Sequence, residues 1–505
     1  MADLLRETYS SASMCPPQLL QVPVKGDVIV PDTKPDADKI LQTSVRYMPA
    51  DAALEHRKVR VQGELEFTVL YLSQEEMPAL RSLTSVLPVE EEINLDGIME
   101  EDDRVRFQIA YTPENIRSTL LNGRKLSLSA LLEIEVQVTK YEDTAVIMDV
   151  AGEENLVLNR IQKPVSRLVG DKEEKLIVRE SEAVKDGSPN IQEILWWDAS
   201  IRNRSCRLLE DKVQVKGEIA VSVLYQTENG VQFFDYSTDF AGLLEVSGCR
   251  EDMEAALQME IVKGFVHADA DADGEQRVLQ MEMIVSCRVR VCEEQMCELV
   301  VDAYDTKQDV LLEKPLRFMQ HQIYRDQLRA DVAETLEIPE NMPMALQVFY
   351  TTARVKVDDY VIEDGKLQIE GVLYVTVFCL TADDRSPVIS FTQPVPFEKS
   401  TAVSGAEPGQ NVEIVPYLES VRSELRNEKK LDMKASLALE VSIVAEERQE
   451  VLTELLLQEG EVEELPAMAL YYLQPGETVW DVGKRYRVLP DCMEKMGESV
   501  VMVVR

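Results

Sequence analysis

The sequence predicts a mainly β protein, with three tandem β-sandwich-like repeats followed by a small C-terminal βααβ module. Two observations support this prediction: a strand-like motif that recurs with a fixed period, and a short C-terminal segment whose apolar residues have helical spacing. With 505 residues the chain is too long for one ordinary domain, because domains typically hold roughly 100–200 residues. We therefore expect several separate hydrophobic cores.

A strand-like run near residue 60 recurs twice further along the chain. Its central glycine repeats with a period of 154 residues (217 − 63 and 371 − 217), and a proline upstream keeps the same period. Such spacing indicates three copies of one structural unit. The aligned runs are residues 59–71, 213–225 and 367–379, with Gly63, Gly217 and Gly371 at their centres and Pro35, Pro189 and Pro343 upstream.

The first run alternates apolar and polar residues, which is the pattern of a half-buried antiparallel strand. The glycine inside it indicates a β-bulge or a close approach of another part of the chain. The face expected to be buried consists of Val59, Val61, Leu65, Phe67, Val69 and Tyr71.

The rest of each repeat is also rich in strands. After each landmark proline, a short apolar segment favours one or two helical turns, since proline is tolerated at the first helical position. Each repeat then ends with a hairpin, which together with the short strands favours a β-sandwich. We place the repeats at 1–160, 161–315 and 316–450, with closing strands at 126–138, 278–291 and 431–443.

Residues 451–467 are acidic and are expected to be a linker, and residues 468–505 form the small module. In the module, Thr478 can cap a helix, with Asp481 as its capping-box partner. Val479, Val482 and Tyr486 would share one apolar face of that helix. A second short helix over 489–496 and a closing strand over 499–504 complete the expected βααβ order.

This module resembles a LysM domain across residues 476–486. LysM domains hold glycans that contain N-acetylglucosamine in a groove between two loops. The resemblance implies that Gly476, Glu477, Thr478 and Val479 form the first wall of that groove.

The sequence departs from the LysM pattern in two places. Glu477 replaces the usual aspartate, and the segment that should form the second wall, 495–498, is very short. The shortening favours protein docking over glycan binding. Trp480 lies off the apolar helix face, so it is either exposed to a partner or part of the module's own core.

The repeats, with their Pro-Asp…Ile-Leu element and Val-x-Val-x-Gly-x-Leu strand, resemble the SPOCS domain of endospore-forming Firmicutes. Three such domains followed by a LysM domain resemble a clostridial family of spore-envelope morphogenetic proteins. The resemblance implies a non-enzymatic adaptor in the mother-cell cytoplasm that acts at the forespore surface. Its implied partner is the coat basement-layer ATPase, stage IV sporulation protein A, bound through the LysM-like module. The alternative is a protein that binds peptidoglycan of the cell wall or spore cortex.

Composition argues against several function classes. The formal net charge of −39 disfavours binding to nucleic acid or to an anionic membrane. No apolar run reaches the ~18 residues that a membrane span needs, and the N-terminus lacks the pattern of a signal peptide. We therefore expect an intracellular protein with no membrane insertion.

The residues that could support catalysis or metal binding are scattered. The three histidines, His56, His267 and His321, have no nucleophile context, and the eight cysteines have no CxxC spacing. Residues 269–274 begin like a calcium loop, but Gln280 stands where a bidentate glutamate is required, so an acidic hairpin tip is expected. We expect no catalytic residue, no metal site and no cofactor.

Overall fold

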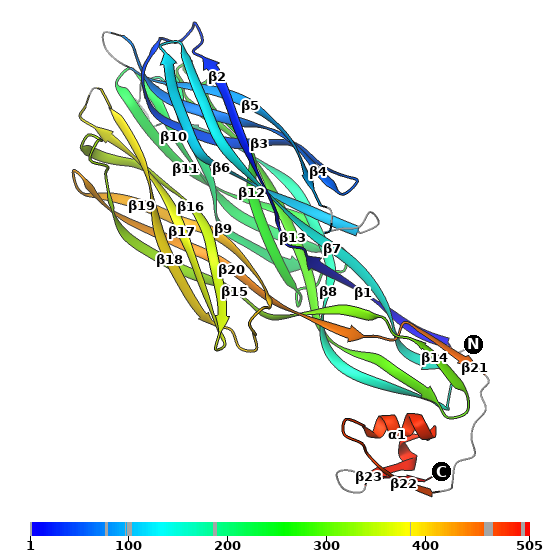
Figure 1. Cartoon of the computed structure of the whole chain (residues 1–505). Coiled ribbons are helices and arrows are strands. Elements are labelled where there is room, and N and C mark those ends of the chain that lie inside the picture. Colours follow the sequence, from blue (N-terminus) through cyan, green and yellow to red (C-terminus); the bar gives the residue numbers. More distant parts are fainter. Residues whose placement is uncertain are drawn as a thin grey trace.

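The computed structural model describes residues 3–75, 79–95, 97, 104–184, 189–383, 385–458, 468–495 and 500–504. It confirms a mainly β protein in which strands dominate the described residues. Figure 1 shows long strands gathered at one end, a narrower ribbon-like region below them, and the C-terminal module beyond its tip.

Each repeat forms two sheets of long antiparallel strands that face each other across one core, as expected of a sandwich. In the first repeat, β4 is the middle strand of one sheet and β7 that of the other. The strands are β1 (Asp3–Met14), β2 (Gln18–Ile29), β3 (Ala37–Glu55), β4 (Lys58–Ser73), β5 (Leu80–Asn94), β6 (Arg104–Asn122) and β7 (Lys125–Ala151).

The second and third repeats use the same plan, with sheets β9–β10–β11 and β8–β13–β12, then β16–β17–β18 and β15–β20–β19. Their strands are β8 (Leu156–Ala183), β9 (Glu193–Leu209), β10 (Lys212–Thr227), β11 (Gly230–Glu245), β12 (Glu254–Ala270), β13 (Gln276–Asp305), β15 (Leu316–Glu337), β16 (Ala345–Glu363), β17 (Lys366–Thr381), β18 (Val388–Ala402), β19 (Asn411–Asn427) and β20 (Lys430–Glu450). Two short strands, β14 (Asp309–Glu313) and β21 (Glu454–Gln458), form a separate two-stranded sheet.

The alternating motif predicts the core correctly. All six residues of the predicted face, from Val59 to Tyr71 on β4, are fully buried in the core of the first repeat. The expected closing strands exist as β7, β13 and β20, but each is longer than predicted and lies in the middle of its sheet.

The repeated glycines lie where another part of the chain approaches closely. A Cβ added at Gly63 would lie 2.7 Å from the Met48 carbonyl oxygen, and one at Gly371 would clash with that of Lys356. The neighbouring strand is irregular at each site, with register shifts between Pro49 and Asp51 and between Val357 and Asp359. Both a close approach and a bulge therefore occur at this position of the repeat.

The expected helical turns after the landmark prolines are wrong, because these segments are the starts of β3, β9 and β16. Their strand form has a packing reason. Leu195 and Trp196 lie in a cluster shared by the three repeats, whereas the half-buried Ile194 packs against the core of its own sandwich. The register of β9 against β10 shifts between Ile194 and Trp196, and this bulge at Leu195 lets two successive side chains face the cluster. The alternation of the strand then turns Trp197 back to the core of its own sandwich.

This central cluster joins the three repeats into a closed arrangement. Residues 41, 195 and 349 keep the 154-residue period, as do 70, 224 and 378. The ring centroids of Trp196 and Phe378 lie 5.0 Å apart, although the two residues come from different repeats. The cluster consists of Leu70, Leu80, Leu195, Trp196, Leu224, Phe349, Phe378 and Val388, with Leu41, Val231, Tyr350 and Leu380 packed against it.

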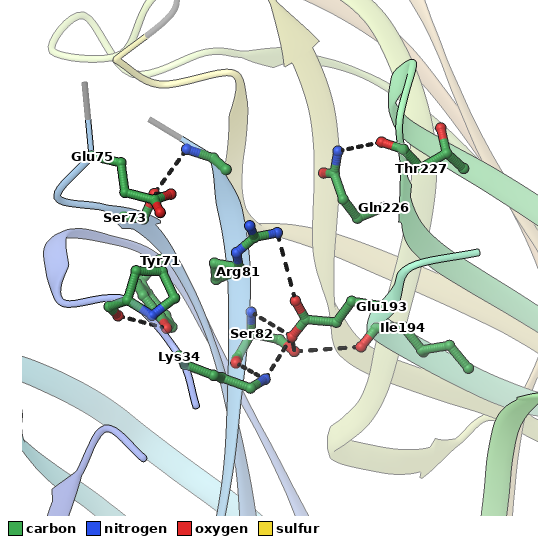
Figure 2. A network of polar contacts seen from close by, with 12 residues as sticks. Lys34, Tyr71, Ser73, Glu75, Arg81, Ser82, Glu193, Ile194, Gln226 and Thr227 are labelled. Carbon is green, nitrogen blue, oxygen red and sulfur yellow. Dashed lines mark hydrogen bonds and ion pairs between the residues drawn. The ribbon is translucent and has the colours of Figure 1, made fainter. Parts of the chain in front are cut away.

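Polar contacts also cross the boundary between the first two repeats. Glu193, at the start of β9, accepts hydrogen bonds from Lys34 Nζ at 2.6 Å and Ser82 Oγ at 2.9 Å (Figure 2). Arg81 Nη1 lies 4.0 Å from the same carboxylate. One glutamate of the second repeat therefore fixes three side chains of the first.

Below the sandwiches, long strands continue into the narrower region, which we call the stalk. It contains β1, residues 139–151 of β7, residues 156–168 of β8, residues 292–305 of β13, β14 and β21. The stalk has its own apolar interior, which includes Ile147, Val300, Ala303, Leu452 and Leu455.

The structure corrects the first part of the expected linker. Residues 454–458 form β21, which pairs along its whole length with β14, and Leu455 is buried in the stalk. Residues 455–457 are three consecutive leucines, of which Leu455 is buried, Leu457 is half-buried and Leu456 is exposed, so the sequence here shows no alternation of apolar and polar residues. Residues 459–467 lie outside the described residues. The expected boundary at 160/161 falls inside β8.

Candidate partner-binding site

Over residues 468–495 and 500–504, the C-terminal module consists of a three-stranded sheet and one α-helix. The sheet has the order β22–β24–β23, with β22 (Met468–Tyr472), β23 (Met493–Lys495) and β24 (Val500–Val504). The helix α1 (Val479–Tyr486) packs on one face, where Val482, Val488, Val501 and Val503 form a small core.

The expected second helix over 489–496 is wrong. Residues Pro490–Cys492 form one 3₁₀ turn (η1), and β23 follows at once. A single helical turn gains few internal hydrogen bonds, whereas β23 pairs with β24 and places Met493 against the module's core. The expected second wall, 495–498, lies outside the described residues apart from Lys495.

The first predicted wall is held together by a local polar network. Gly476 has φ +89°, a left-handed conformation that favours glycine. Next to it, the Glu477 carboxylate accepts hydrogen bonds from the Gln474 backbone at 2.9 Å, the Tyr471 hydroxyl at 3.0 Å and Arg485 Nη2 at 2.7 Å. These bonds, led by the one from the Gln474 backbone, lower the pKa of Glu477. Glu477 is therefore occupied in fixing the loop.

The predicted capping box is present at the start of α1. Asp481 Oδ2 accepts the Thr478 backbone N–H at 2.8 Å, and the Thr478 side chain accepts from the Asp481 backbone. Val479, the last residue of the predicted wall, packs against the module's core. Thr478 remains exposed at the edge of the loop.

Trp480 follows neither of the two alternatives that the sequence left open. Its ring lies against Tyr304 of β13, with the two ring centroids 4.9 Å apart. Its Nε1 donates a hydrogen bond of 2.9 Å to Asp302 Oδ2. Trp480 therefore attaches the module to the tip of the stalk.

Asp302 is the centre of this attachment. Lys484 Nζ lies 2.7 Å from both carboxylate oxygens, and Lys314 Nζ lies 3.2 Å from one of them. Burial alone would raise the pKa of Asp302, but the hydrogen bonds from Lys484, Trp480 and Lys314 outweigh it and lower the pKa. The ionised carboxylate is the form that holds the module.

Two further contacts complete the attachment. The Tyr304 hydroxyl donates a hydrogen bond of 2.7 Å to the carbonyl oxygen of Val488, and it lies where a Cβ on Gly483 would clash. Arg487, just after α1, forms an ion pair with Asp309 of β14. The stalk residues that contact the module, Asp302, Tyr304 and Asp309, were not predicted. Nothing in the sequence relates residues near 305 to residues near 485.

The other face of the module's sheet is apolar and exposed. Met468, Leu470 and Tyr472 alternate along β22 and are 61%, 58% and 67% exposed. Met502 lies opposite Leu470 on β24. The sequence could have predicted this exposed face from the alternation along β22. Residues 469, 471 and 473 pack against the core, so residues 468, 470 and 472 must point the other way.

The residues considered for other chemistry do not come together. Residues 271–275 form the turn between β12 and β13, as expected of a hairpin tip. No group of three or more histidine, cysteine, aspartate or glutamate residues within the described ranges is arranged to hold a metal ion. Among the same residues, every helix is too short or too polar to cross a bilayer.

Comparison with known families bears on the repeats. The family model "SipL, SPOCS domain" matches residues 36–121, 190–266 and 345–426. The chain is a SipL-like protein with three tandem SPOCS domains. No curated protein and no solved structure matches it.

Each SPOCS match lies within one sandwich. It begins with the strand that leads to the central cluster and ends in β6, β12 or β19. The matches leave out the stalk and the C-terminal module, so the LysM resemblance rests on the sequence pattern alone. The SPOCS domains relate the chain to sporulation.

Proposed function

We propose that this SPOCS protein is a non-enzymatic adaptor in endospore envelope assembly. In this proposal the sandwiches and the stalk form a scaffold, and the LysM-like module at the stalk tip docks the coat basement-layer ATPase, stage IV sporulation protein A. The site of action is the forespore surface, on the side of the mother-cell cytoplasm. The SPOCS domains support the link to sporulation, and the partner comes from the family resemblance.

The observation that supports docking is the exposed apolar face formed by Met468, Leu470 and Tyr472. Small soluble modules seldom leave such a face uncovered unless it serves an interaction. Residues 468–505 also hold five acidic and five basic residues, although the whole chain carries a net charge of −39. The module can therefore approach an acidic partner without the repulsion that the rest of the chain would cause.

A pull-down with purified stage IV sporulation protein A tests the proposal. Intact protein should retain the ATPase, and a chain that ends at residue 466 should not. Leu470→Arg should weaken retention, because it places a charge in the apolar face. Ile177→Arg is the matched control, since Ile177 is 54% exposed on β8 in the second repeat. Equal retention by intact and shortened chains would refute docking through the module.

A further inference from the structure

A cavity of about 400 Å³ lies between the second and third sandwiches. Its volume falls in the range of small-molecule sites. Strands β8, β9, β12 and β13 line one side, and strands β15, β19 and β20 line the other. Part of the lining is apolar, including Leu168, Leu257, Val415, Val441 and Val444.

Arg204 enters this lining because of a bulge in β9. The register of β9 against β10 shifts between Arg202 and Ser205, and Asn203 within the bulge has φ +51°. Bulges re-aim a side chain out of the regular alternation. At the equivalent positions of the other two repeats, 154 residues away on either side, the sequence has Ala50 and Asp358. The arginine is therefore particular to this cavity.

The Arg204 guanidinium lacks the partners that a half-buried cation requires. Its Cζ lies 3.9 Å from the centroid of the Tyr417 ring, which supports one face of the group. Its Nε and Nη1 are buried, and neither has a hydrogen-bond partner among the described residues. Burial of unpaired donors on a charged group is costly. Glu440 acts on Arg204 electrostatically but accepts no hydrogen bond from Nε or Nη1, so an anionic group from outside would supply the missing acceptors.

Two half-buried carboxylates, Glu413 and Glu440, line the same cavity. Neither forms an ion pair with a described residue, and burial raises the pKa of Glu440. With Asp326 they make three acidic residues in the lining, against the three arginines Arg204, Arg290 and Arg325, so the cavity presents both signs of charge. A molecule that also carries a cationic donor would satisfy both signs of charge.

From these contacts we propose that the cavity binds a small apolar zwitterion, a short peptide of about two residues. Its carboxylate accepts hydrogen bonds from Arg204, its ammonium group donates to Glu440 or Glu413, and its apolar side chains lie against the aliphatic lining. The proposal does not depend on the function of the C-terminal module.

Calorimetric titration of the full chain with leucyl-leucine tests the site. The dipeptide should bind at millimolar concentration or below. Its C-terminal amide, which lacks the carboxylate, and its N-acetyl form, which lacks the ammonium group, should each bind at least about tenfold more weakly, as expected when one charge-assisted hydrogen-bond partner is lost.

Variants test the residue assignments. Arg204→Gln should weaken dipeptide binding at least about tenfold, while Arg207→Gln, an exposed arginine on the same strand, should leave it unchanged. Glu440→Gln should weaken the dipeptide but not its N-acetyl form. Thermal unfolding of each variant shows whether the fold is retained. Absence of heat with leucyl-leucine, or equal binding by wild type and a folded Arg204→Gln variant, would overturn the proposal.

Discussion

Lys484 of α1 contacts both carboxylate oxygens of Asp302 on β13, at 2.7 Å each, and so joins the C-terminal module to the stalk across 182 residues of sequence. Asp302 also accepts from Trp480, which packs on Tyr304 two residues further along the strand. Asp302 therefore holds two residues of α1 at once, next to the contacts that Tyr304 and Asp309 make with the module.

Asp302→Ala should loosen the attachment of the module to the stalk, although the contacts of Tyr304 and Asp309 with the module remain. It removes the acceptor for Trp480 and Lys484, with a loss of about 1–2 kcal/mol of docking free energy after discounting for the solvent exposure of Lys484. Hydrogen exchange should become faster in residues 479–488 and around Tyr304. Asp273→Ala, at an exposed hairpin tip, is the control and should leave both segments unchanged. Unaltered exchange in Asp302→Ala would contradict the role of this carboxylate.

Asp171→Asn should destabilise the contact between the first and second repeats. The Asp171 side chain is 2% exposed and accepts two hydrogen bonds from Arg288, at 2.8 Å and 2.7 Å, while Arg106 and Tyr141 reach it from the first repeat. Breaking a buried ion pair typically costs about 3–5 kcal/mol. Chemical denaturation should show this loss, and Asp239→Asn, an exposed substitution in the same repeat, should show almost none.

Acid should weaken the same contact. Burial acts to raise the pKa of Asp171, but the hydrogen bonds from Arg288 and Tyr141 prevail and lower it to about 2. A carboxyl whose pKa is depressed by folding stabilises the native state above its unfolded pKa of about 3.9, and this stabilisation is lost as pH falls towards 2. The stability of wild type should therefore drop between these values. Asp171→Asn should show a smaller drop, and an identical acid profile would contradict this explanation.

Gly371→Ala should destabilise the third repeat more than Gly217→Ala destabilises the second. The added methyl group at Gly371 would clash with the backbone carbonyl oxygen of Lys356 on β16, which cannot move without shifting the strand. At Gly217 the nearest atoms, at 2.8 Å, belong to the Phe240 ring, which can rotate or shift. We expect a cost of about 1–3 kcal/mol at Gly371. Thermal denaturation of the two variants measures the difference, and equal melting points would argue against backbone contact as the cause.

Thr478→Arg distinguishes protein docking from glycan binding. If the module is a protein-docking surface, purified peptidoglycan should not sediment the intact chain, and the substitution should change nothing in that assay. Clear co-sedimentation that is lost in Thr478→Arg would instead favour the glycan alternative, since Thr478 is the exposed residue at the edge of the loop. Thr478→Ser preserves the helix cap and serves as the control.

The sequence predicts the sandwiches well because the burial of a strand face depends on the pattern of residues within that strand. Alternation places residues 59–71 on a core face, and the repeated glycine indicates a close approach, as observed at Gly63. The central cluster was missed, although the run Val69-Leu70-Tyr71-Leu72 breaks the alternation. Consecutive apolar residues indicate a strand buried on both faces, and Leu70 is in fact buried between repeats.

The site is less predictable than the fold. The capping box of α1 and the turn at Gly476 follow from short-range pattern, and both are present. The position of Trp480 depends on Asp302 and Tyr304, which no local pattern connects to it. The prediction of a second helix was wrong because Met493 pairs with Val503 in the sheet. The spacing of apolar residues along the sequence does not reveal such a pairing.

The shared apolar cluster at the centre of the three sandwiches limits how this architecture can evolve. In open repeat proteins, units can be added or removed because each contacts only its two neighbours. Here each sandwich contributes side chains to one common centre and packs against both others. Deleting one copy would expose the apolar residues that the remaining two contribute, and a fourth copy would have no place at the centre. The number of sandwiches is thus fixed by the packing at the centre. Insertions and deletions are therefore expected in the loops, the stalk and the C-terminal module.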